Sequence, residues 1–234
     1  MDNDIREISK AVEAAANFGS SGLEKAEKLG SFFAKVFKEP IQEVAGIIHD
    51  KLKYIRWKNI LKISDDVEKI LKERKVENTK AIPLKLALPL IDNASLEEDQ
   101  NLQNLWSNLI ANAMDPNFEN EIRYGFIDMI KNITPIEAFL LNNFYFILKR
   151  ENKLFDLSKV NEYSLSKEQF IKILNISIDN YILAANNLMR LQLIGPAILT
   201  GGVRMGNEPI TIYKGTDRIT LTPLGVKFIE ACIN

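Results

Sequence analysis

The chain has 234 residues, of which 46% are hydrophobic and 26% charged, so it has the composition of an ordinary globular protein with enough apolar side chains for a core. Its formal net charge of -1 gives no reason to expect a nucleic acid or a membrane surface as partner. The lone cysteine, Cys232, excludes an intramolecular disulfide and is typical of a reducing compartment. We expect neither a secretory signal nor a membrane span, and therefore a cytoplasmic protein.

Residues 1–38 predict an N-terminal amphipathic helical segment, interrupted by Gly19-Ser20-Ser21-Gly22. In residues 23–37 the apolar side chains follow one side of the expected helix and the lysines the other. Docking of this helix on the protein core is the favoured interpretation. Contact of residues 23–37 with a membrane or a protein partner is the alternative.

Residues 39–150 predict a helical domain that opens with a long helix over residues 41–75. The middle of this helix carries a basic belt with one tryptophan, which is the candidate interaction surface: Lys51, Lys53, Arg56, Trp57, Lys58 and Lys62. Cations interleaved with aromatic rings can bind single-stranded nucleic acid, but a solvated basic helix face is the commoner explanation. Residues 92–121 are acidic, so we expect the belt to face them within one chain or between two.

The clearest amphipathic helix follows Ser95-Leu96-Glu97-Glu98, which predicts a capping box with Ser95 as the N-cap. In this helix Trp106 shares a face with Leu102 and Leu109, so we expect Trp106 to be buried and structural. The preceding helix is expected over residues 84–93, and Pro89 is expected to kink or end it. The carboxylates that follow Ser95 are explained by the cap and the helix dipole, so no metal site is expected.

A further helix is predicted to start at the capping motif Thr134-Pro135-Ile136-Glu137 and to end this domain, because the polar stretch after Arg150 indicates a domain boundary. The residues predicted for its buried side are Phe139, Leu140, Asn143, Phe144, Ile147 and Leu148.

Residues 151–234 predict a winged-helix-like module. Two helices flank the tight turn Asn175-Ile176-Ser177, a hairpin follows within residues 193–222, and Thr222-Pro223-Leu224-Gly225 starts a closing helix. The expected fold class is mainly α: a helical N-terminal domain followed by a winged helix-turn-helix-like C-terminal module with a small β-hairpin.

Winged helices often bind DNA, so this module has candidate nucleic-acid contacts on its second helix and its hairpin: Asn180, Asn186, Asn187, Arg190, Arg204, Lys214 and Arg218. The cations are too few for the several phosphate contacts of a tight DNA binder. Packing or protein contact is therefore the favoured use of the module, and nucleic-acid binding is the alternative.

The sequence carries no recognisable catalytic motif. His49 is the only histidine, and no phosphate loop, dinucleotide fingerprint or zinc-ligand spacing occurs. We therefore expect no enzymatic activity, no cofactor and no small-molecule substrate.

Several stretches resemble the Abi-alpha (abortive infection alpha) family of bacterial proteins: Tyr54–Asn59, Pro83–Leu90, Ala94–Asp99, Leu102–Ala113, Ile133–Pro135 and Asn187–Leu191. The resemblance implies a role in phage resistance, in which the infected cell stops growing or dies, and it supplies no catalytic residues. We expect a non-enzymatic anti-phage protein that acts through contacts with a phage or host protein, through self-association, or by disturbing the membrane. A winged-helix nucleic-acid-binding regulator is the alternative.

Overall fold

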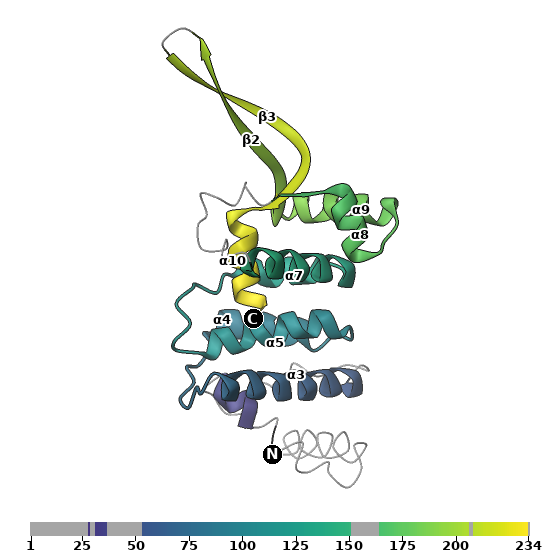
Figure 1. Cartoon of the computed structure of the whole chain (residues 1–234). Coiled ribbons are helices and arrows are strands. Elements are labelled where there is room, and N and C mark those ends of the chain that lie inside the picture. The colour runs from purple at the N-terminus through teal and green to yellow at the C-terminus, as the bar shows by residue number, and fades with distance from the viewer. Residues whose placement is uncertain (1–27, 29–30, 37–52, 151–163, 206–207, 234) are drawn as a thin grey trace, which may run out of the picture. The chain divides into compact units, whose positions relative to one another are not determined.

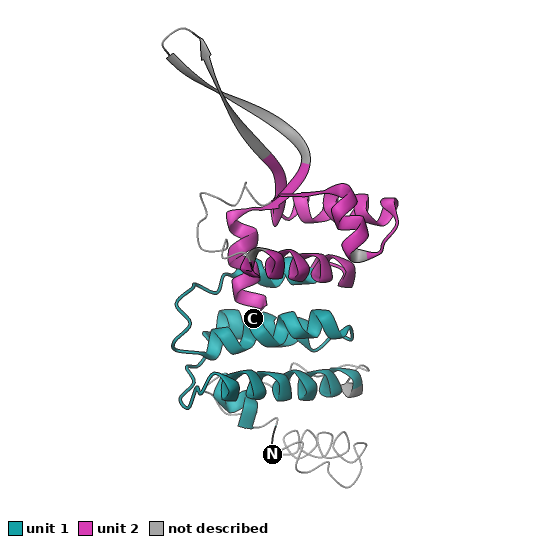
Figure 2. Cartoon of the chain, in the orientation of Figure 1, with its two compact units in different colours: residues 1–131 teal, residues 132–234 magenta. Residues whose placement is uncertain are grey.

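The computed structural model describes residues 28, 31–36, 53–150, 164–205 and 208–233. The chain divides into two compact units, unit 1 with residues 1–131 and unit 2 with residues 132–234 (Figure 2). Among the described helices, none combines the length and the apolar character that crossing a membrane requires.

Unit 1 is helical (Figure 1). Its helices include α3 (Lys53–Glu73), α4 (Leu84–Ala94), α5 (Gln100–Met114) and α6 (Tyr124–Lys131). Helix α5 packs against the other three, which explains why almost all of its residues after Leu102 are buried. Trp106 is 1% exposed, which confirms the buried position predicted from its shared face with Leu102 and Leu109.

The cap of α5 differs from the prediction. Ser95 is not its N-cap but follows the end of α4, where its hydroxyl donates to the Asp92 carbonyl at 2.6 Å. The N-cap is Asp99, whose carboxylate accepts from the backbone N–H groups of Asn101 at 2.8 Å and Leu102 at 3.2 Å. The predicted capping box was wrong because α4 extends to Ala94, which leaves Asp99 as the capping side chain next to the first turn of α5.

The described part of the N-terminal segment is docked on unit 1. Residues Phe32, Phe33 and Val36 are buried, and Lys28 forms an ion pair with Asp65 of α3. These contacts agree with the favoured interpretation of this segment as a docked helix. The rest of the segment lies outside the described residues.

Unit 2 combines helices with a small sheet. Its elements in chain order are α7 (Pro135–Arg150), β1 (Leu165–Ser166), α8 (Lys167–Leu174), α9 (Ile178–Arg190), β2 (Ile194–Met205), β3 (Glu208–Leu221) and α10 (Pro223–Cys232). The strands pair antiparallel in the order β1-β3-β2. The hairpin register runs from Ile194 opposite Leu221 to Met205 opposite Glu208. This order of helix, strand, helix-turn-helix and hairpin is that of a winged helix, and it confirms the predicted fold class.

Serine N-caps begin both helices of the helix-turn-helix. Ser166 forms a capping box with Gln169 at the start of α8, and the Ser177 hydroxyl accepts from the Asn180 N–H at the start of α9. Between these helices Asn175 has a φ of 50°, a left-handed conformation that asparagine tolerates better than most residues. The tight turn predicted from Asn175-Ile176-Ser177 is therefore confirmed.

Helix α7 belongs to unit 2, whereas the sequence placed it in the preceding domain and the boundary after Arg150. It packs against α8, α9 and α10, and the ring of its Phe144 meets that of Phe170 edge-on at 5.3 Å. An apolar stripe indicates that a helix has a neighbour but not which neighbour. Phe139, predicted to be buried, is 44% exposed. Strand β1 was not predicted because two residues are too short to show a strand pattern.

The closing helix α10 depends on a close backbone approach at Gly225. A Cβ atom at this position would lie 1.9 Å from the Leu193 carbonyl oxygen, and Thr222 donates its N–H to the same oxygen at 3.1 Å. We predict that Gly225→Ala lowers the free energy of unfolding by about 1–3 kcal/mol or more, as overpacking does. Chemical denaturation of the full chain measures it.

The matched control is Gly125→Ala in α6, where an added Cβ would meet no atom within 4 Å. A helical glycine replaced by alanine gains about 0.5–1 kcal/mol, so this variant should be as stable as the parent or more so. If Gly225→Ala behaved in the same way as Gly125→Ala, the close approach would be contradicted.

Candidate interaction surfaces

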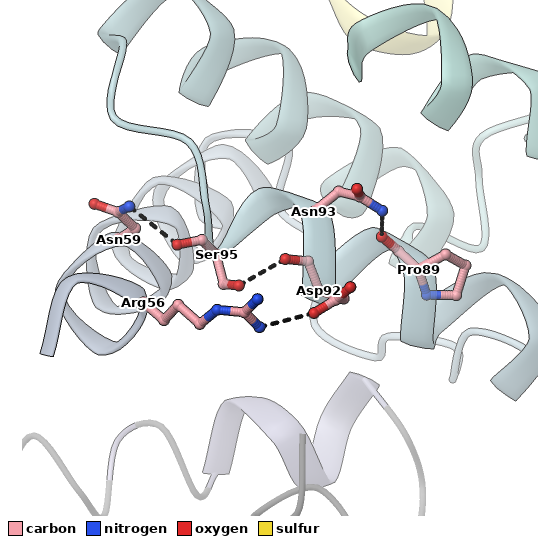
Figure 3. A network of polar contacts seen from close by, with 6 residues as sticks. All are labelled: Arg56, Asn59, Pro89, Asp92, Asn93 and Ser95. Atoms are coloured by element: carbon pink, nitrogen blue, oxygen red, sulfur yellow. Dashed lines mark hydrogen bonds and ion pairs between the residues drawn. The ribbon is translucent and has the colours of Figure 1, made fainter. Parts of the chain in front are cut away.

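A network of polar contacts joins α3 to the end of α4 in unit 1 (Figure 3). Arg56 Nη1 lies 2.8 Å from Asp92 Oδ1, and the buried Asn59 donates from Nδ2 to the Ser95 carbonyl oxygen at 3.0 Å. Helix α4 continues through Pro89, and Asn93 Nδ2 donates to the Pro89 carbonyl at 2.6 Å. The network satisfies backbone oxygens where α4 ends.

The basic belt is therefore not one free surface. Arg56 is committed to Asp92 within the chain, which is one contact of the kind expected between the belt and the acidic residues. Lys58 is exposed, and the exposed Lys62 donates to Gln100. Trp57 is half-buried.

Two members of the belt lie at the edge of the described chain. Lys53 is the first residue of α3, and Lys51 lies outside the described residues.

Helix α9, the second helix of the helix-turn-helix, has two different sides. Its inner side packs into unit 2 through buried residues that include Tyr181 and Leu188. Its outward side exposes three large apolar residues, Ile178, Ile182 and Leu183, and Leu183 is 69% exposed. This outward apolar face was not predicted from the sequence, although its three residues point in other directions around the helix axis than the buried ones.

Two of the candidate nucleic-acid contacts on α9 have partners within unit 2. Asn187 Nδ2 donates to the Asn132 carbonyl at 2.7 Å and to Glu137 Oε2 at 2.9 Å. Asn187 Oδ1 accepts from Arg190 Nε at 3.1 Å and Nη2 at 2.7 Å. Glu137 is buried and also accepts from the Thr134 N–H at 2.6 Å. The polar end of α9 thus fixes the helix to the start of α7.

The other candidate contacts are distributed over α9 and the hairpin. Asn180 and Asn186 are exposed on α9. Arg204 of β2 lies opposite Pro209, and Lys214 of β3 lies opposite Leu199. Arg218 Nε donates to Ser164 Oγ at 2.8 Å, and its Nη2 donates to the Ser164 carbonyl, so this guanidinium is oriented by the chain just before β1.

A pocket of about 270 Å³ lies between α9, the first residue of α8 and the base of the hairpin. Its lining residues are Lys167, Tyr181, Ile182, Ala185, Asn186, Met189, Pro196, Arg218 and Ile219. These described lining residues are largely apolar and include two cations. Sequence analysis did not predict this pocket.

The described residues include no cluster of metal ligands and one buried thiol. Among them, no group of three or more His, Cys, Asp or Glu side chains is placed to hold a metal ion. Cys232 is fully buried, and burial raises the pKa of its thiol well above the ordinary value. A thiol in this setting has little thiolate and is a packing residue.

The family model described as abortive infection alpha matches residues 56–232, which is most of the chain. The chain belongs to the abortive infection alpha family. The family assigns it to abortive infection, a bacterial defence against phage. No curated protein and no solved structure matches the chain.

Residues that carried the resemblance to the abortive infection alpha family have structural roles. Arg56 and Asn59 hold the end of α4, and Trp106 lies in the core of unit 1. Asn187 fixes α9 through the buried Glu137. These parts of the family pattern are explained by folding.

The structural role of Asn59 predicts a loss of stability on truncation. Asn59→Ala leaves the Ser95 carbonyl without the donor at 3.0 Å, and an unsatisfied buried polar group costs about 1–3 kcal/mol. Chemical denaturation should show this loss. The exposed neighbour Lys58 provides the control, because Lys58→Ala should change the unfolding free energy by at most about 0.5 kcal/mol. Equal stability of the two variants would contradict the assignment.

Proposed function

We propose that this abortive infection alpha protein defends the cell without catalysis, by binding a phage or host protein through the outward apolar face of α9. The observation that carries the proposal is the exposure of Ile178, Ile182 and Leu183 on this helix. Ile178 and Ile182 are four residues apart and share one side of α9, and Leu183 follows Ile182 directly in the chain. Exposed apolar side chains favour protein contact, because burying them in a partner is favourable.

The chemistry of α9 favours a protein over a nucleic acid. A DNA-reading helix needs polar groups for base edges and cations for phosphates. Here Arg190 and Asn187 hydrogen-bond with each other, and Asn187 is also held by Glu137. The exposed Asp179 adds a negative charge in the first turn of α9, where it would repel phosphate.

The described part of the N-terminal segment also favours protein contact over membrane disturbance. Phe32, Phe33 and Val36 are buried in unit 1. A helix that lies on a membrane inserts its apolar side into the lipid. These three side chains are already used in packing, so they are not available for such insertion.

A single lysine substitution distinguishes protein binding by α9 from nucleic-acid binding by α9. Leu183→Lys removes exposed apolar area and adds a cation, so it should weaken protein contact and strengthen any contact with phosphate. We predict that bacteria expressing Leu183→Lys lose most of the protection against a phage that the parent chain restricts, as counted in plaques. Because Leu183 is 69% exposed, the folded state should be unaffected, which circular dichroism and thermal unfolding check.

The matched control is Leu84→Lys, at another exposed leucine that begins α4. This variant should protect as the parent chain does. Protection that is unchanged or raised in Leu183→Lys would overturn the proposed protein contact, and a raised value would favour the nucleic-acid-binding regulator.

A further inference from the structure

Strand β2 is the outer strand of the sheet in unit 2. The described strands lie in the order β1-β3-β2, so β2 has its neighbour, β3, on one side. A strand at the end of a sheet presents backbone N–H and C=O groups with which another strand can pair. The other side of β2 is therefore a backbone surface that can accept one more strand.

Pro209 shows which backbone groups of β2 point away from β3. Residues of antiparallel strands alternate between pairs that exchange two hydrogen bonds and pairs that exchange none. Pro209 lies opposite Arg204 and has no N–H to donate, so this pair is of the second kind. In the unbroken register from residue 198 to residue 205, Ile198, Thr200 and Gly202 belong to the same kind. The N–H and C=O groups of these four β2 residues therefore point away from β3.

The two strands of the hairpin differ in how their edges are protected. Natural proteins block a free strand edge with prolines and charged residues. Strand β3 carries Pro209, Glu208 and Lys214, whereas the run Ile198–Val203 of β2 contains neither a proline nor a charged residue. Two strands alone are marginally stable in water, so pairing with a further strand along Ile198–Val203 would stabilise the hairpin.

We propose that β2 pairs antiparallel with β2 of a second copy of this chain, around a two-fold axis at Gly201. Ile198 then lies opposite Arg204 of the other copy, and Thr200 lies opposite Gly202. In this register all four outward-directed residues exchange hydrogen bonds across the axis. Arg204 is the only charged residue of β2, so no two charges lie opposite each other. The sheet becomes continuous across the two copies.

The test is sedimentation velocity of the purified full-length chain over a concentration series, which measures the dissociation constant of a dimer. We expect the parent chain to dimerise. Thr200→Pro removes an outward-directed N–H and no hydrogen bond to β3, so it should raise the dissociation constant about tenfold or more, which corresponds to about 1.4 kcal/mol. The matched control is Thr211→Pro, at the position of β3 opposite Gly202, which should leave the dissociation constant unchanged.

A cysteine crosslink tests the same register and does not depend on the folding of a proline variant. Gly201 of the two copies meets at the axis in a pair without hydrogen bonds, where Cα atoms lie about 4.5 Å apart, within the span of a disulfide. Gly201→Cys should therefore form a covalent dimer under oxidising conditions, whereas Thr211→Cys should not. The buried Cys232 does not compete for this crosslink.

Three results would overturn the proposal: a parent chain that stays monomeric, a dimer that Thr200→Pro weakens no more than Thr211→Pro does, or no covalent dimer of Gly201→Cys. A dimer that dissociates in Leu183→Lys would place the interface on α9 and would also overturn it. The pairing uses backbone groups of β2 and the proposed protein contact uses side chains of α9, so the two proposals fail separately.

Discussion

The hydrogen bonds of Asn187 to Glu137 and to the Asn132 carbonyl set the orientation of α9, and the rest of the functional interpretation depends on that orientation. Glu137 is buried, so its carboxylate requires donors, and it receives them from Asn187 and from the Thr134 N–H. Together with the packing of Tyr181 and Leu188, this contact fixes which side of α9 faces inward. Ile178, Ile182 and Leu183 consequently face solvent.

Polar side chains have a similar structural role in unit 1. Arg56 forms an ion pair with Asp92, and Asn59 donates to the Ser95 carbonyl oxygen, at the end of α4. In both units the polar residues that carried the family resemblance satisfy buried or terminal groups of the chain itself. Such contacts stabilise the fold because a buried polar group without a partner is costly. The family pattern therefore describes how the protein folds more directly than it describes what the protein contacts.

The order of elements in unit 2 could be predicted from sequence because residues next to each other in the chain, such as N-caps, mark where its helices begin. Ser166, Ser177 and Thr222 are N-caps within hydrogen-bonding distance of nearby backbone N–H groups, and such caps need no knowledge of tertiary structure. The place of α7 could not be predicted in this way, because its apolar stripe fits any neighbour. The cap of α5 was misassigned because Ser95 and Asp99 are both good capping residues and only the length of α4 decides between them.

The candidate surfaces were harder to predict than the fold. Asn187 and Arg190 were predicted as nucleic-acid contacts from their residue types alone. The residue type of Asn187 does not show that it hydrogen-bonds with Glu137, which lies 50 residues away in the chain. The outward apolar residues of α9 were overlooked because apolar residues of an amphipathic helix are expected to face the core. The pocket combines Lys167, Pro196 and Arg218 from three separate elements, and no spacing along the chain brings them together.

We propose that α9 presents a surface for protein and not for nucleic acid. The most direct measurement is the fluorescence anisotropy of labelled random duplex DNA titrated with the full-length chain, at low salt and at about 0.15 M, where surface charge is largely screened beyond about 8 Å. We expect no submicromolar binding by the parent chain at the higher salt. Submicromolar affinity that falls steeply with salt, and that Asn180→Ala reduces, would contradict it, since such a dependence is the signature of phosphate neutralisation.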